Sequence, residues 1–522
     1  MKREDDIDAK VEQARREIDV RAQKIETLRA RGINPFPYNY QISHSLGDFR
    51  QEFNDRIKEP GTLEDRVSIA GRLMLKRAQG KISFGQLEDH SGRMQIMVEN
   101  GTVGEDNYAL FCEWIDRGDI VGVTGVPMRT KRGELSVKVE EVTLLTKAIR
   151  PLPEKWHGIS DPELQYRDRS TYLATNPEAR QLLVQRSQAI TVMREHFNQL
   201  GFLEVEIPLL QPIYGGASAR PFTSHVNALD MRVYLSISPE LYLKRIVAGN
   251  FFQGVYTICK NFRNEGIDHT HNPEFTMMEV YKAFWDYNDM MRLTENVWAE
   301  IFDRVRGTTK VKYGTEGEGP GIVELDFTPP WRRARMLDLV HEYTGIDATQ
   351  MDAKELHAKV REAYEMRKID DRSHDGKLFK QSSWGEIVGE LFSLYVEEHL
   401  IQPTIVIDHP LESTPLCKWH RSDSRLIERF EPFVYGVEIA NAYSELNDPI
   451  VQRRLLEEQA AKGRAGDEEA HQMDEDFVRA IELGVPPMGG LGIGIDRLVM
   501  FLTGATSIRD VIFFPLLRPG YK

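Results

Sequence analysis

Residues 60–147 contain five short runs in which apolar and polar residues alternate. Three examples are Val67–Leu73, Arg93–Val98 and Leu135–Val142. A period of two residues is typical of half-buried β-strands, because successive side chains of a strand point to opposite faces. Polar and glycine-containing turns such as Asp89–Gly92 separate the runs. The pattern therefore predicts an all-β unit of about 90 residues.

Five short strands in such a length are typical of a small barrel of the oligonucleotide-binding (OB) type. Barrels of this kind bind single-stranded nucleic acid by stacking bases on aromatic rings. A barrel that binds no ligand is the alternative that the pattern alone leaves open.

The β-rich segment can be only one part of the chain, because 522 residues exceed what one compact core usually holds. We predict an N-terminal helical extension and linker over residues 1–59, the OB-type barrel over 60–150 and a proline-spotted linker over 151–178. Residues 179–522 are expected to form a larger α+β domain, with a helical insertion around 335–400. The predicted fold class is therefore α+β.

Residues 7–31 predict an amphipathic helix, since apolar residues recur at spacings of three and four. Arg15, Arg16, Arg21 and Lys24 make the rest of it largely basic, and Gly32 ends it. Two interpretations stay open. The helix either packs on its neighbour with a solvated outer face, or also contacts a phosphate backbone.

The overall charge limits the classes of function. The net charge is −14, which argues against a protein that coats nucleic acid without specificity. Residues 61–150 carry 13 basic and 13 acidic side chains, so a specific contact remains compatible with this region. We expect no membrane span and no secretory signal. Three widely spaced cysteines, Cys112, Cys259 and Cys417, fit a reducing cytoplasm.

The segment from Phe262 to Tyr281 is the strongest local candidate for a site. If residues 274–283 form a strand, one of its faces carries a ring, a thioether, a carboxylate and a phenol: Phe275, Met277, Glu279 and Tyr281. Such a face suits a pocket that holds a flat ring and a cation. Arg263, just before it, can clamp a phosphate with its planar guanidinium. A hairpin with a surface salt bridge is the alternative.

A second candidate is the glycine-rich segment Gly490–Arg497. Glycine at every second residue of a strand leaves one face bare, so a flat ligand can approach the backbone closely. Arg497 can hold a terminal phosphate. The chain has neither a GxGxxG dinucleotide fingerprint nor a GxxxxGK[ST] phosphate loop. Tight packing against the bare face is the alternative.

Glu431, Glu438 and Glu445 are spaced by seven residues. Strict alternation would place Glu438 and Glu445 on opposite strand faces unless a bulge intervenes. Carboxylates suit Mg²⁺ that bridges nucleotide phosphates, and a solvated acidic edge is the alternative. His269 and His271 do not predict zinc, because no cysteine cluster completes four ligands. His271 better fits a loop that contacts phosphate.

Three segments resemble, in order, the three motifs of class II aminoacyl-tRNA synthetases: Gly201–Pro208, Phe262–Glu279 and Gly490–Arg497. With the barrel in front, the chain resembles subclass IIb, the group for lysine, aspartate and asparagine. Further stretches resemble its lysine-specific family, the lysyl-tRNA synthetases: Gly215–Phe222, His225–Asp230, Pro239–Arg245, His271–Glu279 and Asn441–Asp448.

One substitution pattern favours lysine among these substrates. Where aspartate and asparagine enzymes resemble one another at Ser-Pro-Gln-Leu-Tyr-Lys, this chain has Glu240 and Leu243. In those enzymes the lysine of this stretch contacts the side chain of the substrate. In this chain Leu243 replaces that lysine, and Glu240 adds a carboxylate. A cationic substrate requires acidic partners, whereas an acidic substrate would be repelled.

The resemblance implies ATP-dependent ligation of L-lysine to tRNA(Lys) through a lysyl-adenylate, with Mg²⁺, in a homodimer built on motif 1. It implies catalytic roles for Arg263 and Arg497. The implied lysine pocket comprises Gly216, Glu240, Glu279, Tyr281, Asn441 and Glu445, with either Glu279 or Glu445 on the ε-ammonium. The implied ATP contacts are Arg263, Glu265, His271, Phe275, Gly492 and Arg497, with Glu431 and Glu438 as metal ligands. Arg77, Phe84, Gln95 and Glu134 match positions that read the anticodon.

Thr270, Lys260 and Ser236 stand where the family often has arginine, which implies weaker phosphate contacts without changing the reaction class. Three other functions compete with lysine ligation. They are an asparagine or aspartate synthetase, a paralogue that keeps the fold without charging tRNA, and an enzyme of this fold that modifies a protein. Relatives of the last kind lack the front barrel.

Overall fold

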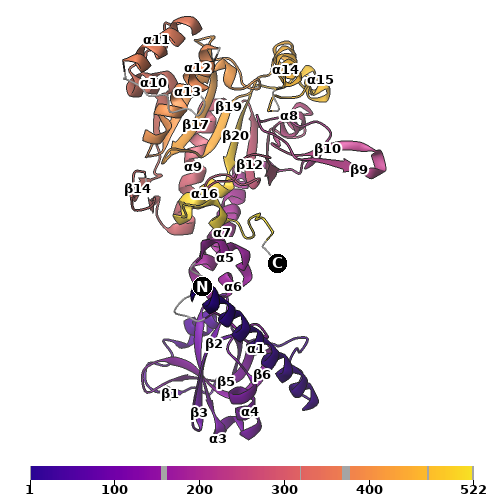
Figure 1. Cartoon of the computed structure of the whole chain (residues 1–522), viewed down its shortest axis with the longest axis vertical. Coiled ribbons are helices and arrows are strands. Elements are labelled where there is room, and N and C mark those ends of the chain that lie inside the picture. The colour runs from indigo at the N-terminus through magenta and orange to yellow at the C-terminus, as the bar shows by residue number, and fades with distance from the viewer. Residues whose placement is uncertain are drawn as a thin grey trace. The chain divides into compact units, whose positions relative to one another are not determined.

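The computed structural model describes residues 2–153, 161–317, 319–366, 377–381, 383–466 and 469–519, with side chains described for residue 12 and from residue 15 onward. The chain divides into two compact units, Met1–Ser160 and Asp161–Lys522 (Figure 1). The first contains a closed β-barrel and the second a large, mostly antiparallel sheet with helices. The predicted α+β class, with an OB-type barrel in front, is confirmed.

Five strands close the barrel in the order β5-β2-β3-β4-β6, with β6 pairing back onto β5. They are β2 (Val67–Gln79), β3 (Ile82–Glu88), β4 (Arg93–Glu99), β5 (Ile120–Arg129) and β6 (Leu135–Thr146). A two-residue strand, β1 (Gly61–Thr62), extends the edge of β5. Along β4 every second residue is buried, so the alternation in the sequence separates the barrel interior from its surface.

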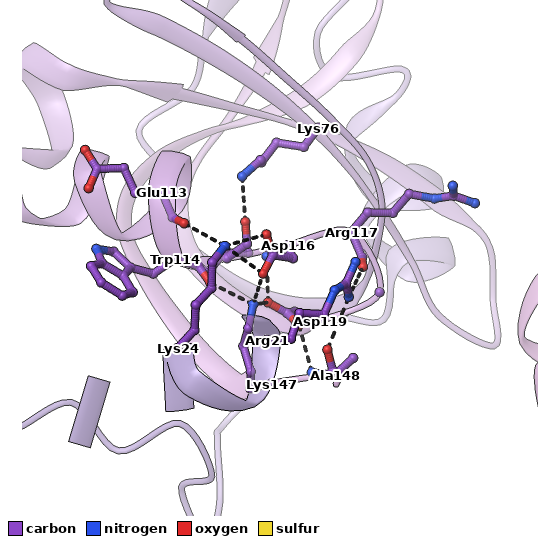
Figure 2. A network of polar contacts seen from close by, with 12 residues as sticks. Arg21, Lys24, Lys76, Glu113, Trp114, Asp116, Arg117, Asp119, Lys147 and Ala148 are labelled. Atoms are coloured by element: carbon purple, nitrogen blue, oxygen red, sulfur yellow. Dashed lines mark hydrogen bonds and ion pairs between the residues drawn. The ribbon is translucent and has the colours of Figure 1, made fainter. Parts of the chain in front are cut away.

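The N-terminal helix α1 (Lys2–Ala30) packs on the barrel, with Leu28 fully buried in the barrel's core. Two of its basic side chains bind this unit directly (Figure 2). Lys24 Nζ lies 2.8 Å from Asp116 Oδ1, and Arg21 donates to the carbonyl oxygens of Arg117 and Ala148. The helix therefore packs on its neighbour, and part of its basic face is committed to that contact.

The other helical elements of this unit are short. They are α2 (Leu46–Phe53), α3 (Asn100–Val103), α4 (Glu105–Ala109) and a π-helical turn at Leu110–Trp114.

The main sheet of the second unit runs in the order β15-β16-β17-β19-β20-β12-β11-β7, with β18 on β17. Its strands are β7 (Leu203–Glu204), β11 (Gly254–Phe262), β12 (Glu274–Ala283), β15 (Arg332–Arg335), β16 (Thr404–Pro410), β17 (Leu426–Val434), β18 (Val437–Glu438), β19 (Ala440–Ser444) and β20 (Met488–Gly494). All neighbours are antiparallel except β7–β11 and β15–β16.

Long helices cover one face of this sheet and form its core. They are α7 (Pro177–Gln199), α9 (Tyr287–Arg306) and α16 (Ile495–Thr503). Leu491 and Ile493 of β20 pack into the same core as Trp298 of α9. Asp286 begins α9 with a capping box, and Gly307, at φ 75°, ends it. This face of the sheet is therefore filled by apolar packing, which leaves the opposite face for a ligand.

The remaining strands form two small sheets. β8 (Leu210–Gln211), β9 (Thr223–Val226) and β10 (Met231–Leu235) make one, and β13 (Lys310–Tyr313) with β14 (Val323–Asp326) makes the other. The remaining helices near the sheet are α8 (Glu240–Ala248), α14 (Pro449–Arg464), α15 (Glu475–Glu482) and α17 (Ile508–Val511).

Two segments bear on the predicted domain organisation. In the predicted linker 151–178, residues 154–160 lie outside the described residues, and the rest contains α5 (Pro162–Arg167) and α6 (Arg169–Thr175). Arg169 donates to the carbonyl oxygens of Ile512 and Phe513, so these turns are folded against the second unit rather than extended. The predicted insertion 335–400 contains α10 (Met336–Thr344), α11 (Ala353–Glu365), α12 (Lys377–Lys380) and α13 (Trp384–Tyr395). Its residues 367–376 and 382 are outside the described part.

Candidate active site

The register of three central strands builds the floor of the site. On β20, Gly490 and Gly492 pair with Tyr281 and Glu279 of β12 on one side. On the other side the same two glycines pair with Tyr443 and Asn441 of β19. Paired residues of neighbouring strands share a sheet face, so bare glycine backbone lies between two rows of side chains. The bare face inferred from the sequence is present.

A cavity of about 350 Å³ lies over this floor. Every residue predicted to bind lysine, ATP or metal lines it: Gly216, Glu240, Arg263, Glu265, His271, Phe275, Glu279, Tyr281, Glu431, Glu438, Asn441, Glu445, Gly492 and Arg497. They come from strands, a helix and loops that are up to 281 positions apart in the sequence. Folding alone brings these groups together.

Two glycines are required by the shape of the cavity wall. A Cβ at Gly490 would lie 1.9 Å from Glu445 Oε1 and 2.5 Å from Tyr281 Cε1. A Cβ at Gly216 would lie 2.8 Å from Ser238 Oγ, and its φ of +86° already favours glycine. Glycine at 490 therefore makes room for the Glu445 carboxylate.

Glu240, Glu279 and Glu445 form what we call the acid cluster, and their exposed fractions are only 3%, 5% and 1%. Most of their oxygen atoms have protein donors. Ser238 Oγ donates to Glu279 Oε1 at 3.0 Å and the Tyr281 hydroxyl to Glu279 Oε2 at 3.1 Å. The Tyr443 hydroxyl donates to Glu240 Oε2 at 2.7 Å. Burying three carboxylates is costly unless each is hydrogen-bonded or paired with a charge.

The cation that pairs with this cluster, Lys244, was not indicated by any pattern in the sequence. Lys244 lies one helical turn after Glu240 on α8 and is fully buried. Its Nζ lies 2.6 Å from Glu240 Oε1 and also forms an ion pair with Glu445 Oε2. Burial alone would lower the pKa of Lys244, but the charges of Glu240 and Glu445 raise it to about 12. Lys244 therefore places a charged ammonium group behind the cavity wall.

Burial raises the pKa of two members of the acid cluster, Glu279 and Glu445, because it disfavours their charged forms. Burial, together with the charge of Glu240, raises the pKa of Glu279 to about 8. Burial likewise raises the pKa of Glu445 well above its usual range. A cation entering the cavity would favour ionisation of these groups, so the cavity is electrostatically prepared for an ammonium ligand.

A second group of side chains carries positive charge. The Arg263 guanidinium lies 5.1 Å from the ring centroid of Phe275, and its buried Nε has no hydrogen-bond partner among the described residues. Arg497 donates to the Glu438 carbonyl at 2.6 Å and its other nitrogen lies 3.1 Å from His271 Nε2. His271 Nδ1 lies 2.8 Å from Asp268 Oδ2. Two guanidinium groups and an aromatic ring thus face the same cavity as the acid cluster.

Glu431 and Glu438 come from β17 and β18. Arg429 pairs with Glu431, and burial with the charge of Glu431 raises the pKa of Glu438. Glu438 and Glu445 reach one cavity because β18 ends at Glu438 and a separate strand, β19, begins at Ala440. In the described part of the chain no group of three or more His, Cys, Asp or Glu side chains is arranged to hold a metal. Two carboxylates fit Mg²⁺, which usually takes its other ligands from phosphates and water.

The three residues that stand where the family often has arginine, Ser236, Lys260 and Thr270, all have partners within the protein. Ser236 is fully buried, and its Oγ accepts from Gln211 and donates to the Ser238 carbonyl, both at 3.1 Å. Lys260 pairs with Glu274 at 3.2 Å, and Thr270 Oγ1 donates to Asp268 at 3.0 Å. None of the three is left with an unsatisfied side chain.

A buried ion pair and a hydrogen bond link the second and third motifs, and neither was predicted from the sequence. Arg186 of α7 pairs with Asp496 at 2.6 Å, and Asp496 accepts the backbone N–H of Thr276, also at 2.6 Å. Asp496 directly precedes Arg497 in the third motif, and this position was the feature of the sequence that could have indicated its role. Arg429, Tyr443 and His471 line the cavity as well, although no spacing in the sequence pointed to them.

The four barrel positions matched to anticodon readers are also brought together. Arg77 of β2 pairs directly with Phe84 of β3, and Gln95 of β4 pairs with Ser136 of β6. The Gln95 amide donates to Ser136 Oγ at 2.9 Å. Phe84 lies between the buried residues Ser83 and Gly85, so its ring is on the outer side of the barrel wall. Glu134 is exposed in the turn before β6.

Comparison with known proteins agrees with this geometry. Residues 161–518 match the family model described as tRNA synthetases class II (D, K and N), and residues 67–145 match an OB-fold nucleic acid binding domain. A lysine–tRNA ligase of Clostridium perfringens is 48% identical over 502 residues, covering 96% of both chains. One of Thermotoga maritima is 47% identical over 500 residues, 96% of this chain and 95% of the relative. The chain therefore belongs to the class II tRNA synthetases, and among them to the lysine–tRNA ligase family.

Proposed function

We propose that the protein ligates L-lysine to tRNA(Lys) in an ATP-dependent reaction that passes through lysyl-adenylate and releases AMP and pyrophosphate. One observation carries the proposal. The register of β12, β20 and β19 sets the acid cluster and the two guanidinium groups around one cavity. An acidic wall suits the ammonium groups of lysine, while Arg263 and Arg497 suit its carboxylate and the phosphates.

In this proposal the acid cluster recognises lysine. Glu240, together with the backbone at Gly216, holds the α-amino end, and Glu279 or Glu445 accepts the ε-ammonium. Tyr281 and Asn441 complete the pocket. Support comes from the burial of all three carboxylates, because an ammonium gains most from a charged partner where water is excluded.

ATP is proposed to lie over the glycine floor at Gly492. Phe275 stacks on adenine, Arg263 contacts the α-phosphate, and Arg497 grips the γ-phosphate. Glu265 and His271 provide further contacts. The unpartnered Nε of Arg263 and the open floor support these roles.

The chemistry needs no protein nucleophile. The lysine carboxylate attacks the α-phosphorus and pyrophosphate leaves, after which a terminal ribose hydroxyl of tRNA attacks the carbonyl carbon of the adenylate and AMP leaves. The chain contributes by aligning the reactants and by placing Arg263 and Arg497 against the charge that develops on the phosphoryl oxygens. Glu431 and Glu438 are proposed to hold Mg²⁺, which when bound neutralises phosphate charge.

The barrel is proposed to read the anticodon through Arg77, Phe84, Gln95 and Glu134. The shared outer position of Arg77 and Phe84 supports a stacking surface with a nearby cation. A homodimer built on motif 1 and a cytoplasmic location stay predictions. None of the helices in the described part of the chain is long and apolar enough to span a membrane.

Amino-acid-dependent ATP–pyrophosphate exchange tests the function. The panel comprises lysine, ornithine, arginine, asparagine and aspartate. We expect exchange with lysine and at most weak exchange with the others. Exchange that depends on asparagine or aspartate would assign the chain to a sister activity. No exchange with any amino acid would support a paralogue that does not charge tRNA.

A further inference from the structure

The acid cluster has an uneven supply of hydrogen-bond donors. Both oxygens of Glu279 and both oxygens of Glu240 have protein donors. Glu445 differs, because its Oε2 pairs with Lys244 while its Oε1 is buried with no partner among the described residues. A buried carboxyl oxygen without a hydrogen-bond partner is costly, so it points to a ligand that supplies a donor.

Lys244 causes this difference between the two oxygens of Glu445. It bridges Glu240 and Glu445 from behind, does not itself line the cavity, and lies 5.5 Å from the centroid of the Tyr443 ring. Its ammonium is held between one carboxylate on α8 and one that follows β19, so it joins two separate walls of the pocket. Gly490 leaves the space into which Glu445 Oε1 projects.

Charge balance gives Lys244 a second effect. With lysine bound and the three carboxylates ionised, the acid cluster and Lys244 carry a formal charge of about −2, which the two ammonium groups of lysine neutralise, while Arg263 remains for the substrate carboxylate. Without Lys244 one carboxylate would stay uncompensated after lysine binds. A buried charge without a partner is strongly unfavourable.

We propose that Lys244 is a positioning residue for lysine recognition: by bridging Glu240 and Glu445 it aims Glu445 Oε1 at the substrate ammonium and matches the charge of the pocket to a substrate with two ammonium groups. The inference rests on the proposed function. It assigns a specificity role to a side chain that touches neither substrate.

The test is lysine-dependent ATP–pyrophosphate exchange with Lys244→Met, which keeps the length of the side chain without its charge, and Lys244→Arg, which keeps the charge. Lys244→Met is expected to raise KM for lysine by roughly 100-fold, because removing one partner of a buried charge pair is costly, while KM for ATP changes less than about threefold. Lys244→Arg is expected to recover at least tenfold of that loss.

Lys76→Met is the matched control. Lys76 is a half-buried lysine in the barrel, and it donates to the carbonyl oxygens of Phe111, Cys112 and Ile115. Its loss is expected to leave both KM values unchanged. Should Lys244→Met lose its cooperative thermal transition, Lys244→Gln replaces it with the same expected split, since glutamine keeps a donor but carries no charge.

A normal KM for lysine in folded Lys244→Met or Lys244→Gln would overturn the inference, as would equal rises in KM for lysine and ATP in these variants or a failure of Lys244→Arg to recover lysine binding. Each of these results is distinguishable from failure of the proposed function, which would appear as missing lysine-dependent exchange in the unaltered protein.

Discussion

Arg263 is the single residue whose surroundings tie it most directly to the proposed chemistry. Arg263→Ala is expected to reduce adenylate formation to near background, because it removes a guanidinium placed against developing phosphoryl charge. Lysine-dependent ATP–pyrophosphate exchange measures this step. The fold should survive, since Arg263 stands in a loop beyond β11, and circular dichroism checks that. Normal exchange in the folded variant would contradict the assignment.

If Glu279 binds lysine as proposed, lysine binding is expected to depend on pH. Its pKa of about 8 in the empty pocket lies above the usual carboxylate value because of burial and the charge of Glu240. It is therefore mostly neutral below that pH and charged above it. Since an ammonium binds a carboxylate more tightly than a carboxylic acid, KM for lysine is expected to fall as the pH rises from about 6.5 to about 8.5.

The Glu279→Gln variant is the control, because it has no titrating group at this position. Its KM for lysine should be higher and should vary less over the same range. Titration calorimetry in buffers of different ionisation enthalpy provides an independent check. Lysine binding near pH 7 should release protons from the unaltered protein and fewer from Glu279→Gln, and equal release would argue against this role.

At the scale of elements, strand β20 is proposed to lie beneath both ligands, with Gly490 on the lysine side and Gly492 on the ATP side. Gly490→Ala would place a Cβ 1.9 Å from Glu445 Oε1, so the carboxylate must move. Gly492→Ala would place its Cβ 3.4 Å from the nearest atom, the methyl group of Met277, so the strand can accommodate it. The added methyl group would, however, project from the glycine floor into the cavity. We expect Gly490→Ala to raise KM mainly for lysine and Gly492→Ala to raise KM mainly for ATP. Identical effects on both substrates would contradict the assigned places of the two ligands.

Helix α1 is held to the barrel by polar as well as apolar contacts, since its Lys24 pairs with Asp116, which also pairs with Lys147 (Figure 2). Lys147 is fully buried and lies 2.8 Å from Asp119, which is also fully buried. Lys147→Met would leave that carboxylate without its charge partner, and the expected loss of stability is about 3–5 kcal/mol. Hydrogen–deuterium exchange of peptides from residues 67–146 measures it in this unit.

Lys24→Met is the control, since Lys24 is partly exposed and its partner Asp116 keeps Lys147. Its effect should be much smaller. Equal deprotection in the two variants would mean that burial of Lys147 adds no special stability.

For the whole molecule, the two units imply two separable activities. Phe84→Ala is expected to weaken tRNA charging and to spare adenylate formation, because a base stacked on an aromatic ring contributes about 1–3 kcal/mol. Aminoacylation of tRNA(Lys) and pyrophosphate exchange, measured on the same preparation, separate the steps. Tyr38→Ala is the control, since it removes an exposed ring from another part of this unit. Equal loss of both activities would contradict the division of labour.

Much of the fold could be read from local patterns. Alternation predicted the barrel strands, and glycine at every second position predicted the bare face of β20, because both depend only on the two-residue period of a strand. Local patterns predicted a linker over residues 151–178, and the described part of this segment contains the helices α5 and α6. These helices are held by distant carbonyl oxygens that accept from Arg169, which no local pattern reports.

The sequence by itself determined which chemical groups the protein possesses: the carboxylates, the two arginines, the glycine floor and the barrel. The tertiary structure alone decided how they are paired. Lys244 reads as an ordinary helical lysine until α8 packs against the segment after β19 and buries it between Glu240 and Glu445. The reason is physical: a strand pattern depends on neighbours in the chain, whereas the partner and the pKa of a buried charge depend on groups that only folding brings within reach.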